Sequence, residues 1–177
     1  GPDSMVKIGA QFDPFYSWLK GKDLGATTWP AGAWKHGAGA VWGWVTYDPE
    51  TKWIYYGTSN TGPWNADQRP GLNLWTSGVF ARNADDGMAR WAFVFTPHNE
   101  WDYDGVNENI LADLTVNGRP RKVMVQFNRN GFAYTIDRLT GEVLVAKPFG
   151  HENWATGIDP KTAMPIVVPE KHTVPPG

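Results

Sequence analysis

Two stretches of this chain, residues 81–91 and 135–145, follow one pattern. Each starts with a small residue or threonine, has Asn or Asp two positions later, and then a turn that ends in Gly. A large apolar residue follows four positions after that Gly. Strand-like runs flank both stretches. The pattern therefore predicts a β-hairpin whose turn is capped by the Asn or Asp side chain and whose Gly adopts a positive φ.

One hairpin pattern that recurs after about 50 residues is typical of proteins built from repeated sheets. The chain has 177 residues, with 20 Gly and 11 Trp, and no window carries a helical apolar stripe. We therefore predict an all-β chain that forms part of a β-propeller, with Trp91 packed between neighbouring sheets. At roughly 50 residues per four-stranded blade it supplies about three blades, fewer than a closed propeller needs. It is expected to be part of a larger domain.

The expected strands are short runs rich in β-branched and aromatic residues, bounded by Gly, Pro, Asn and Asp. One turn, Asp48-Pro49-Glu50-Thr51, has Pro where a type I turn favours it. Residues 1–40 are expected to form an irregular, loop-rich lead-in, and residues 41–177 the blade segments of a single domain. The expected strands are 41–47, 53–57, 74–82, 90–96, 122–128, 132–137 and 142–146.

Charge and composition exclude several classes of function. The net charge is −2, from 16 basic and 18 acidic residues, so no basic field for nucleic acid is expected. No apolar run is long enough to span a membrane. The absence of cysteine excludes disulfides and thiolate metal ligands within the chain.

Carboxylates crowd residues 101–108, Trp-Asp-Tyr-Asp-Gly-Val-Asn-Glu. In an extended backbone Asp102 and Asp104 would point to the same side, and two such carboxylates favour a hard cation. Asn60, which follows the strand expected at 53–57, could offer a neutral oxygen to the same ion. Each feature alone is more often a solvated turn or a capped loop, so the hypothesis depends on their combination.

Two further residues suggest a planar, anionic ligand. Trp42 precedes Gly43, and a Trp beside a Gly allows a flat ligand to approach the ring. Arg129 lies in a polar turn after an apolar strand and could make a forked contact with an anion. The alternatives are core packing for Trp42 and a surface turn for Arg129.

Together these segments resemble the quinoprotein alcohol dehydrogenases that depend on pyrroloquinoline quinone (PQQ), of the methanol dehydrogenase large-subunit type. The similarity is strongest over residues 34–158. The segments that carry it, in chain order, are Gly37-Ala-Gly-Ala-Val-Trp42-Gly-Trp44, Tyr55-Tyr-Gly-Thr-Ser-Asn60, Thr96-Pro-His-Asn-Glu-Trp-Asp102 and Asn128-Arg-Asn-Gly131.

The resemblance implies a role for each candidate residue. Trp42 would be the floor on which PQQ stacks, and Arg129 would contact the reactive quinone oxygens. Asn60 and Asp102 would bind the metal, with Asp102 also the general base. A second aspartate at Asp104 is found in the lanthanide-dependent branch, whereas calcium-type relatives carry a small residue there. The implied cofactors are therefore PQQ and a lanthanide ion, with Ca²⁺ as the alternative.

The resemblance also implies an eight-bladed propeller that oxidises a short primary alcohol, methanol or ethanol, to the aldehyde. The implied setting is a periplasmic homodimer with a c-type cytochrome as electron acceptor. The family's upstream metal-binding Glu, its adjacent-cysteine disulfide and its later blades have no counterpart here, so the isolated chain is expected to be inactive. Hydride transfer is favoured over a hemiketal route, which the sequence leaves open.

Three alternatives remain at this point. A non-catalytic propeller scaffold would keep the hairpin repeat but would have no need of Trp42, Asn60, Asp102, Asp104 and Arg129 together. A carbohydrate-binding β module would fit the 14% aromatic content, with exposed rather than packed Trp. A PQQ-dependent glucose or sorbose dehydrogenase would be less similar over residues 101–107.

Overall fold

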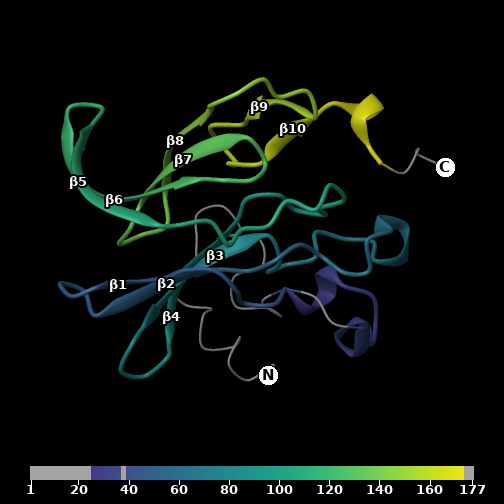
Figure 1. Cartoon of the computed structure of the whole chain (residues 1–177), viewed down its shortest axis with the longest axis horizontal. Helices are drawn as coiled ribbons and strands as arrows, with labels where there is room; N and C mark the ends of the chain where they lie inside the picture. The colour runs from purple at the N-terminus through teal and green to yellow at the C-terminus, as the bar shows by residue number, and fades with distance from the viewer. Residues whose placement is uncertain (1–24, 37–38, 174–177) are drawn as a thin grey trace.

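The computed structural model describes residues 25–36 and 39–173, and they form antiparallel sheets that succeed one another along the chain (Figure 1). Each four-stranded sheet is a simple meander, because its strands pair in sequence order. The first contains β1 (Val45–Asp48), β2 (Trp53–Gly57), β3 (Gly78–Asn83) and β4 (Ala89–Val94). The second contains β5 (Ile110–Val116), β6 (Arg119–Phe127), β7 (Phe132–Asp137) and β8 (Val143–Pro148), and β9 (Ala155–Ile158) pairs with β10 (Pro165–Val167).

Short 3-10 helices provide the only helical turns among the described residues: η3 (Ala26–Thr28), η4 (Ala33–His36), η5 (Ala66–Gln68) and η6 (Pro169–Lys171). The prediction of an all-β chain is therefore confirmed. The described part of the lead-in contains η3 and η4 and no strand, whereas residues 1–24 and 37–38 lie outside the described residues. No described helix has the length and apolar character needed to cross a membrane.

All seven expected strands occur, β2 and β7 with the predicted ends and the other five with shifted ends, and three strands were missed. Residues 41–44 and 74–77 lie outside β1 and β3. At the second of these the backbone turns, with Asn73 and Ser77 both at positive φ. The missed strands are β5, β9 and β10. β5 is followed by Asn117-Gly118, both at positive φ, and this dipeptide is the strongest short-range signal of a two-residue hairpin turn.

The repeated hairpin pattern has the same structure in both copies. The backbone N–H groups of Asp85 and Leu139 donate to the Oδ1 atoms of Asn83 and Asp137, at 2.8 and 3.0 Å. Gly87 and Gly141 have φ of 70° and 81°. The strand register also shifts at the same place in each copy, one residue before the capping residue. The predicted side-chain caps and positive-φ glycines are confirmed.

Trp91 joins the two four-stranded sheets, as its place in the repeat predicts. It lies on β4, is 1% exposed, and its Nε1–H donates to the Arg138 carbonyl at 2.9 Å. A Cβ added to Gly141 would come within 3.0 Å of the indole, so the glycine makes room for the ring. The hydroxyl of Tyr55 donates to the same Arg138 carbonyl at 3.0 Å.

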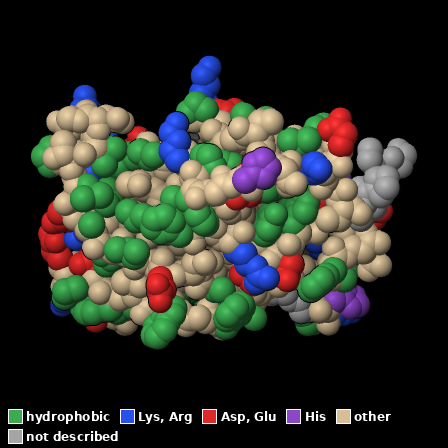
Figure 2. Space-filling model, turned by 45° about the horizontal axis from the view of Figure 1, so that its top comes forward, with side chains coloured by type: hydrophobic (Ala, Val, Ile, Leu, Met, Phe, Trp, Pro, Cys, Tyr) green, Lys and Arg blue, Asp and Glu red, His purple; other side chains and the backbone are tan. Residues whose placement is uncertain are grey.

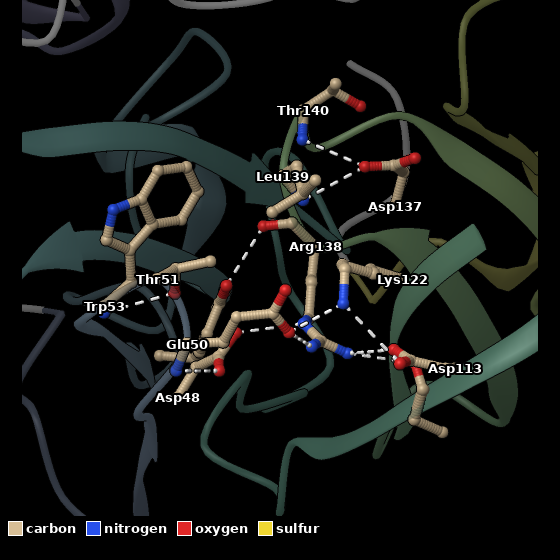
Figure 3. A network of polar contacts seen from close by, with 12 residues as sticks. Asp48, Glu50, Thr51, Trp53, Asp113, Lys122, Asp137, Arg138, Leu139 and Thr140 are labelled. Carbon is tan, nitrogen blue, oxygen red and sulfur yellow. Dashed lines mark hydrogen bonds and ion pairs between the residues drawn. The ribbon is translucent and has the colours of Figure 1, made fainter.

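An ion network lies beside this joint and also crosses between the sheets (Figure 3). The guanidinium of Arg138, after β7, donates to Asp48 at the end of β1 at 3.0 Å, and both side chains are buried. It also contacts Glu50 at 3.4 Å and Asp113 on β5 at 2.9 Å. Lys122 bridges the latter two carboxylates at 2.6 and 3.5 Å. The two sheets are therefore joined by both packing and charge.

The second sheet and the chain beyond it expose large hydrophobic side chains, namely Ile110, Leu114, Phe127, Phe149 and Ile166. On the face shown in Figure 2, hydrophobic side chains gather over the left and middle of the surface. Exposed apolar patches of this kind mark surfaces that contact other protein. Further sheets packed on this one would cover them.

Candidate active site

The candidate site lies where the strands of the first sheet give way to loops. Beyond the strand ends, backbone hydrogen bonds continue from Gly105 N–H to Thr58 O at 2.9 Å and from Thr58 N–H to Gly78 O at 2.8 Å. Two glycines make this contact possible. A Cβ on Gly57 would lie 2.0 Å from Gly105 O, and a Cβ on Gly105 would lie 2.4 Å from Gly78 O. The loop at 101–108 is thereby fixed against the segment that carries Asn60.

Asp104 is buried at this contact, with its side chain 7% exposed. Its Oδ1 accepts the backbone N–H of Asn60 at 2.7 Å, and its Oδ2 accepts Nη1–H of Arg129 at 3.0 Å. The side-chain amide of Asn128 donates to the Asp104 carbonyl at 3.4 Å. Asp104 thus joins the segments after β2 and after β6, which are distant in sequence.

Asp102 faces the same arginine. Its Oδ2 lies 3.6 Å from Nη2 of Arg129, and its side chain is 33% exposed. The premise of an extended backbone, in which alternate residues Asp102 and Asp104 point to the same side, was wrong. Asp102 has a φ of 62°, and residues 101–109 form no strand. The two carboxylates nevertheless converge, since both reach one guanidinium.

A cleft of about 410 Å³ opens beside this group, and its wall includes Trp42, Asp104 and Arg129. Trp42 is 53% exposed, so it is a cleft wall rather than a core residue. Gly43 also makes room for protein backbone, because a Cβ there would lie 2.7 Å from Val106 O. The approach of a flat ligand to the Trp42 ring stays a prediction.

The structure therefore brings all five sequence-predicted residues to one place. Trp42, Asp104 and Arg129 line the cleft, Asp102 contacts Arg129, and Asn60 contacts Asp104. Further lining residues were not predicted as site residues: Trp44, Val106, Asn107, Glu108, Ile110 and Phe127. Ile110 on β5 and Phe127 on β6 have no motif, because they reach the cleft only through the packing of the strands. The other four lie in the segments 37–44 and 101–108, which the sequence analysis singled out.

Buried side-chain amides hydrogen-bond the loop that carries the two carboxylates. Gln126 Nε2 donates to Gly105 O at 3.2 Å and to Asn109 Oδ1 at 2.8 Å. Asn128 Nδ2 donates to Gln126 Oε1 at 2.8 Å. This chain of amides ties β6 to the loop that carries the carboxylates. Sequence reasoning treated these residues as strand and turn only.

The pKa values shift at groups that flank the carboxylates. Burial raises the pKa of the Tyr103 hydroxyl. Burial also raises the pKa of Glu100, but hydrogen bonds from His172 and from Thr173 outweigh it and the pKa falls below its usual value. Glu100 is therefore held as a carboxylate at neutral pH. Within the described residues, no cluster of three or more His, Cys, Asp or Glu side chains forms a metal site.

The fold and this cleft define a class: a β-propeller segment with a carboxylate, arginine and tryptophan site at the ends of its strands. A family model described as "PQQ: Glucose/ethanol/alcohol dehydrogenase, beta-propeller domain" matches residues 11–147. The chain therefore belongs to the PQQ-dependent alcohol dehydrogenase β-propeller family. The resemblance noted in the sequence is confirmed.

Individual relatives agree with this membership. The chain is 48% identical over 174 residues to the lanthanide-dependent methanol dehydrogenase of Methylacidiphilum fumariolicum (strain SolV), which covers 98% of this chain and 28% of the relative. It is 41% identical over 175 residues to methanol dehydrogenase [cytochrome c] subunit 1 of Methylorubrum extorquens, with the same coverage. A solved europium-containing methanol dehydrogenase superposes with a TM-score of 0.90 at 48% identity, over 97% of this chain and 30% of that one.

The chain thus spans less than a third of the length of these relatives. That share agrees with the expectation that it supplies only some blades of a propeller.

Proposed function

We propose that the protein containing this chain oxidises a short primary alcohol to the aldehyde with PQQ and a metal ion, with Asp102 as general base. One observation carries the proposal: Trp42, Asp104 and Arg129 line one cleft, Asp102 contacts Arg129, and the backbone of Asn60 contacts Asp104, although these residues are far apart in the sequence. A non-catalytic scaffold needs the hairpin repeat but gives no reason for this convergence.

The donor set suits a hard metal ion. Asp102 and Asp104 supply carboxylate oxygens, and such oxygens are the ligands that lanthanides and Ca²⁺ share. Each Asp104 oxygen accepts one hydrogen bond and retains a lone pair for an ion. Asn60 is only partly buried, and its side chain carries a neutral amide oxygen of the kind that hard cations accept. A second carboxylate at Asp104 favours a trivalent ion over Ca²⁺.

The cleft also suits a flat, anionic cofactor. The exposed ring of Trp42 offers a stacking surface, and Arg129 offers a half-exposed guanidinium on the same wall. When bound, PQQ would accept the hydride from the alcohol carbon, and the metal would polarise the quinone carbonyl as a Lewis acid.

In this proposal Asp102 acts as the general base that accepts the proton of the alcohol. Its carboxylate is partly exposed toward solvent and so can reach a substrate hydroxyl within hydrogen-bond distance. Arg129 offsets part of the charge of the two carboxylates and contacts Asp102 through its Nη2 atom. Asp104, being buried and held at both oxygens, keeps one geometry while Asp102 exchanges a proton.

The finer parts of the proposal follow the relatives. Methanol as the substrate and a c-type cytochrome as the electron acceptor are supported by the names of the similar proteins, which include lanthanide-dependent methanol dehydrogenases and the [cytochrome c] methanol dehydrogenase subunit. Ethanol as an alternative substrate, the periplasmic setting and the homodimer are proposed from the family resemblance noted in the sequence.

The metal is tested by removing the charge of Asp104 in the full-length protein. Asp104→Asn keeps the shape of the side chain and can still accept the Asn60 N–H through its oxygen, but it removes the carboxylate charge and places an NH2 donor where Oδ2 accepts from Arg129. We expect alcohol oxidation with La³⁺ to fall at least about tenfold, the scale of lost metal-site interactions. Asp104→Ala should lose the La³⁺ response altogether. Activity is measured with La³⁺ and with Ca²⁺ after removal of bound metal.

Asp85→Asn is the matched control, because Asp85 is an exposed aspartate in the β3–β4 turn. It should leave the response to either ion unchanged. Full activity with Ca²⁺ alone and indifference to Asp104→Asn would contradict the lanthanide assignment. No alcohol oxidation by the wild type with either metal would favour the scaffold alternative.

A further inference from the structure

The loop that carries Asp102 adopts an unusual backbone. Asp102 has a φ of 62° and His98 a φ of 50°, both in the left-handed region that non-glycine residues seldom occupy. Such conformations persist only where surrounding contacts determine them, and they cluster at functional sites. The contacts that hold this one therefore also set where the Asp102 carboxylate lies.

Asn99 makes most of those contacts. Its side chain is almost fully buried, and its Oδ1 accepts the backbone N–H of Trp101 at 3.0 Å and of Tyr103 at 3.3 Å. Its Nδ2 donates to the Tyr103 carbonyl at 2.9 Å. One amide thus holds the peptide groups on both sides of Asp102.

Asn99 is itself anchored at two points. Its side-chain Nδ2 donates to Ser77 Oγ at 2.7 Å, and its backbone carbonyl accepts Nη2–H of Arg69 at 2.5 Å. The buried Arg69 guanidinium also donates to Pro63 O at 2.6 Å and Asn73 Oδ1 at 2.8 Å. A buried cation that hydrogen-bonds neutral oxygens of several loops fixes those loops relative to one another.

The Ser77 anchor leads to the second proposed ligand. The backbone N–H of Ser77 donates to Ser59 O at 2.8 Å, and Ser59 precedes Asn60. The path from Asn99 to Asn60 is therefore two hydrogen bonds and one peptide unit long. Asp102 and Asn60 are held in one rigid frame.

The other side of the loop is packed against aromatic rings. Trp101 and Tyr103 both lie against Trp154, with ring centroids 4.8 and 5.4 Å apart. Trp101 Nε1–H donates to the carbonyl of Lys171 at 2.9 Å. These contacts hold the side chains of Trp101 and Tyr103, whereas the hydrogen bonds of the Asn99 side chain fix the backbone turn between them.

We propose that Asn99 is a positioning residue for the site: with Ser77 and Arg69 as its anchors, it fixes the backbone of Asp102 so that this carboxylate and Asn60 face one metal ion. This inference rests on the function proposed above. It adds a residue that touches neither substrate nor metal and acts only through the Asp102 backbone.

Terbium binding tests this in the full-length protein, with Tb³⁺ luminescence as a readout independent of turnover. In Asn99→Ala we expect the Kd for Tb³⁺ to rise about tenfold, the scale seen when groups that orient metal ligands are lost. We expect kcat of the loaded enzyme to fall by about the hundredfold that misplacing a reacting group costs, with KM for alcohol changing less. Ser77→Ala removes one anchor and should weaken Tb³⁺ binding by a smaller factor, so it tests the proposal even where Asn99→Ala fails to fold.

Tyr55→Phe is the matched control. It also removes one buried side-chain hydrogen bond, to the Arg138 carbonyl, but at the joint between the sheets. It should leave the Kd for Tb³⁺ and kcat within about twofold of the wild type. If the wild type binds Tb³⁺ and neither Asn99→Ala nor Ser77→Ala changes the Kd, the positioning role is overturned and the proposed function stands. A wild type that neither binds Tb³⁺ nor oxidises alcohol would overturn the proposed function and this role with it.

Discussion

At the scale of single residues, the Arg138 side chain stabilises the joint between the two four-stranded sheets. Its guanidinium is buried between the sheets and faces Asp48, Glu50 and Asp113 (Figure 3). Arg138 and Asp48 are both almost inaccessible to solvent. Removal of one partner from such a pair leaves the other charge buried and uncompensated.

We predict that Arg138→Met lowers the free energy of unfolding of the full-length protein by about 3 kcal/mol. Methionine keeps much of the aliphatic volume, so the loss reports the charge. Urea denaturation measures it. Arg119→Met is the control, since Arg119 is exposed on β6, and it should change the free energy of unfolding by less than about 0.5 kcal/mol. Equal effects of the two substitutions would show that the network is not stabilising.

Single residues were also where the sequence was most informative about the site. Trp42, Asn60, Asp102, Asp104 and Arg129 could each be named, and the structure brings them together. Asn99 could not be named, although it lies in a segment that was singled out. Its importance depends on a left-handed backbone at Asp102 and on the distant Arg69, and neither has a local sequence signal.

At the scale of elements, the joint between sheets depends on one indole. Trp91 on β4 packs against Gly141 in the β7–β8 turn and donates to the Arg138 carbonyl. The repeat pattern predicted this position, because the large apolar residue ends the pattern in both copies. The strand β5 was missed, although Asn117-Gly118, which follows it, is a strong hairpin signal.

We predict that Trp91→Ala destabilises the full-length protein by about 3–5 kcal/mol, the usual cost of removing a buried large aromatic side chain. Trp34→Ala is the matched control, because Trp34 is 82% exposed in η4. It should shift the free energy of unfolding by less than about 0.5 kcal/mol. Thermal and urea unfolding compare the two variants. A Trp91→Ala protein as stable as Trp34→Ala would mean that the joint adds nothing to stability.

At the scale of the whole molecule, two titratable groups at this joint make stability depend on pH. Burial raises the pKa of Asp48, but hydrogen bonds from Glu50 and Thr51 and the charge of Arg138 outweigh it, so the pKa lies below its usual value. Burial raises the pKa of the Tyr55 hydroxyl above its usual value. Asp48 thus stabilises the fold as a carboxylate, and Tyr55 does so as a neutral phenol.

The signs give a prediction for both ends of the pH scale. The lowered pKa of Asp48 means that its contribution is complete above about pH 4 and is lost as the pH falls further. The raised pKa of Tyr55 means that its contribution is complete below about pH 10 and is lost as the pH rises further. We expect the Tm of the full-length protein to fall at both limits.

Two variants separate these effects. Asp48→Asn should flatten the acid limb of the Tm profile and leave the alkaline limb unchanged, whereas Tyr55→Phe should do the reverse. Asp85→Asn, at an exposed turn position, should leave both limbs as they are. An acid limb that is the same in wild type and Asp48→Asn would contradict the role given to this carboxylate.

The Arg138 peptide carbonyl has a consequence for how such a chain can change over generations. It accepts both Trp91 Nε1–H and the Tyr55 hydroxyl, while the Arg138 side chain serves the ion network separately. Any amino acid at position 138 would still present that carbonyl. Substitutions can therefore change the charged side chains at this joint while the hydrogen bond from the Trp91 indole is kept. The electrostatics of neighbouring blades can diverge in this way while the distance between the blades stays the same.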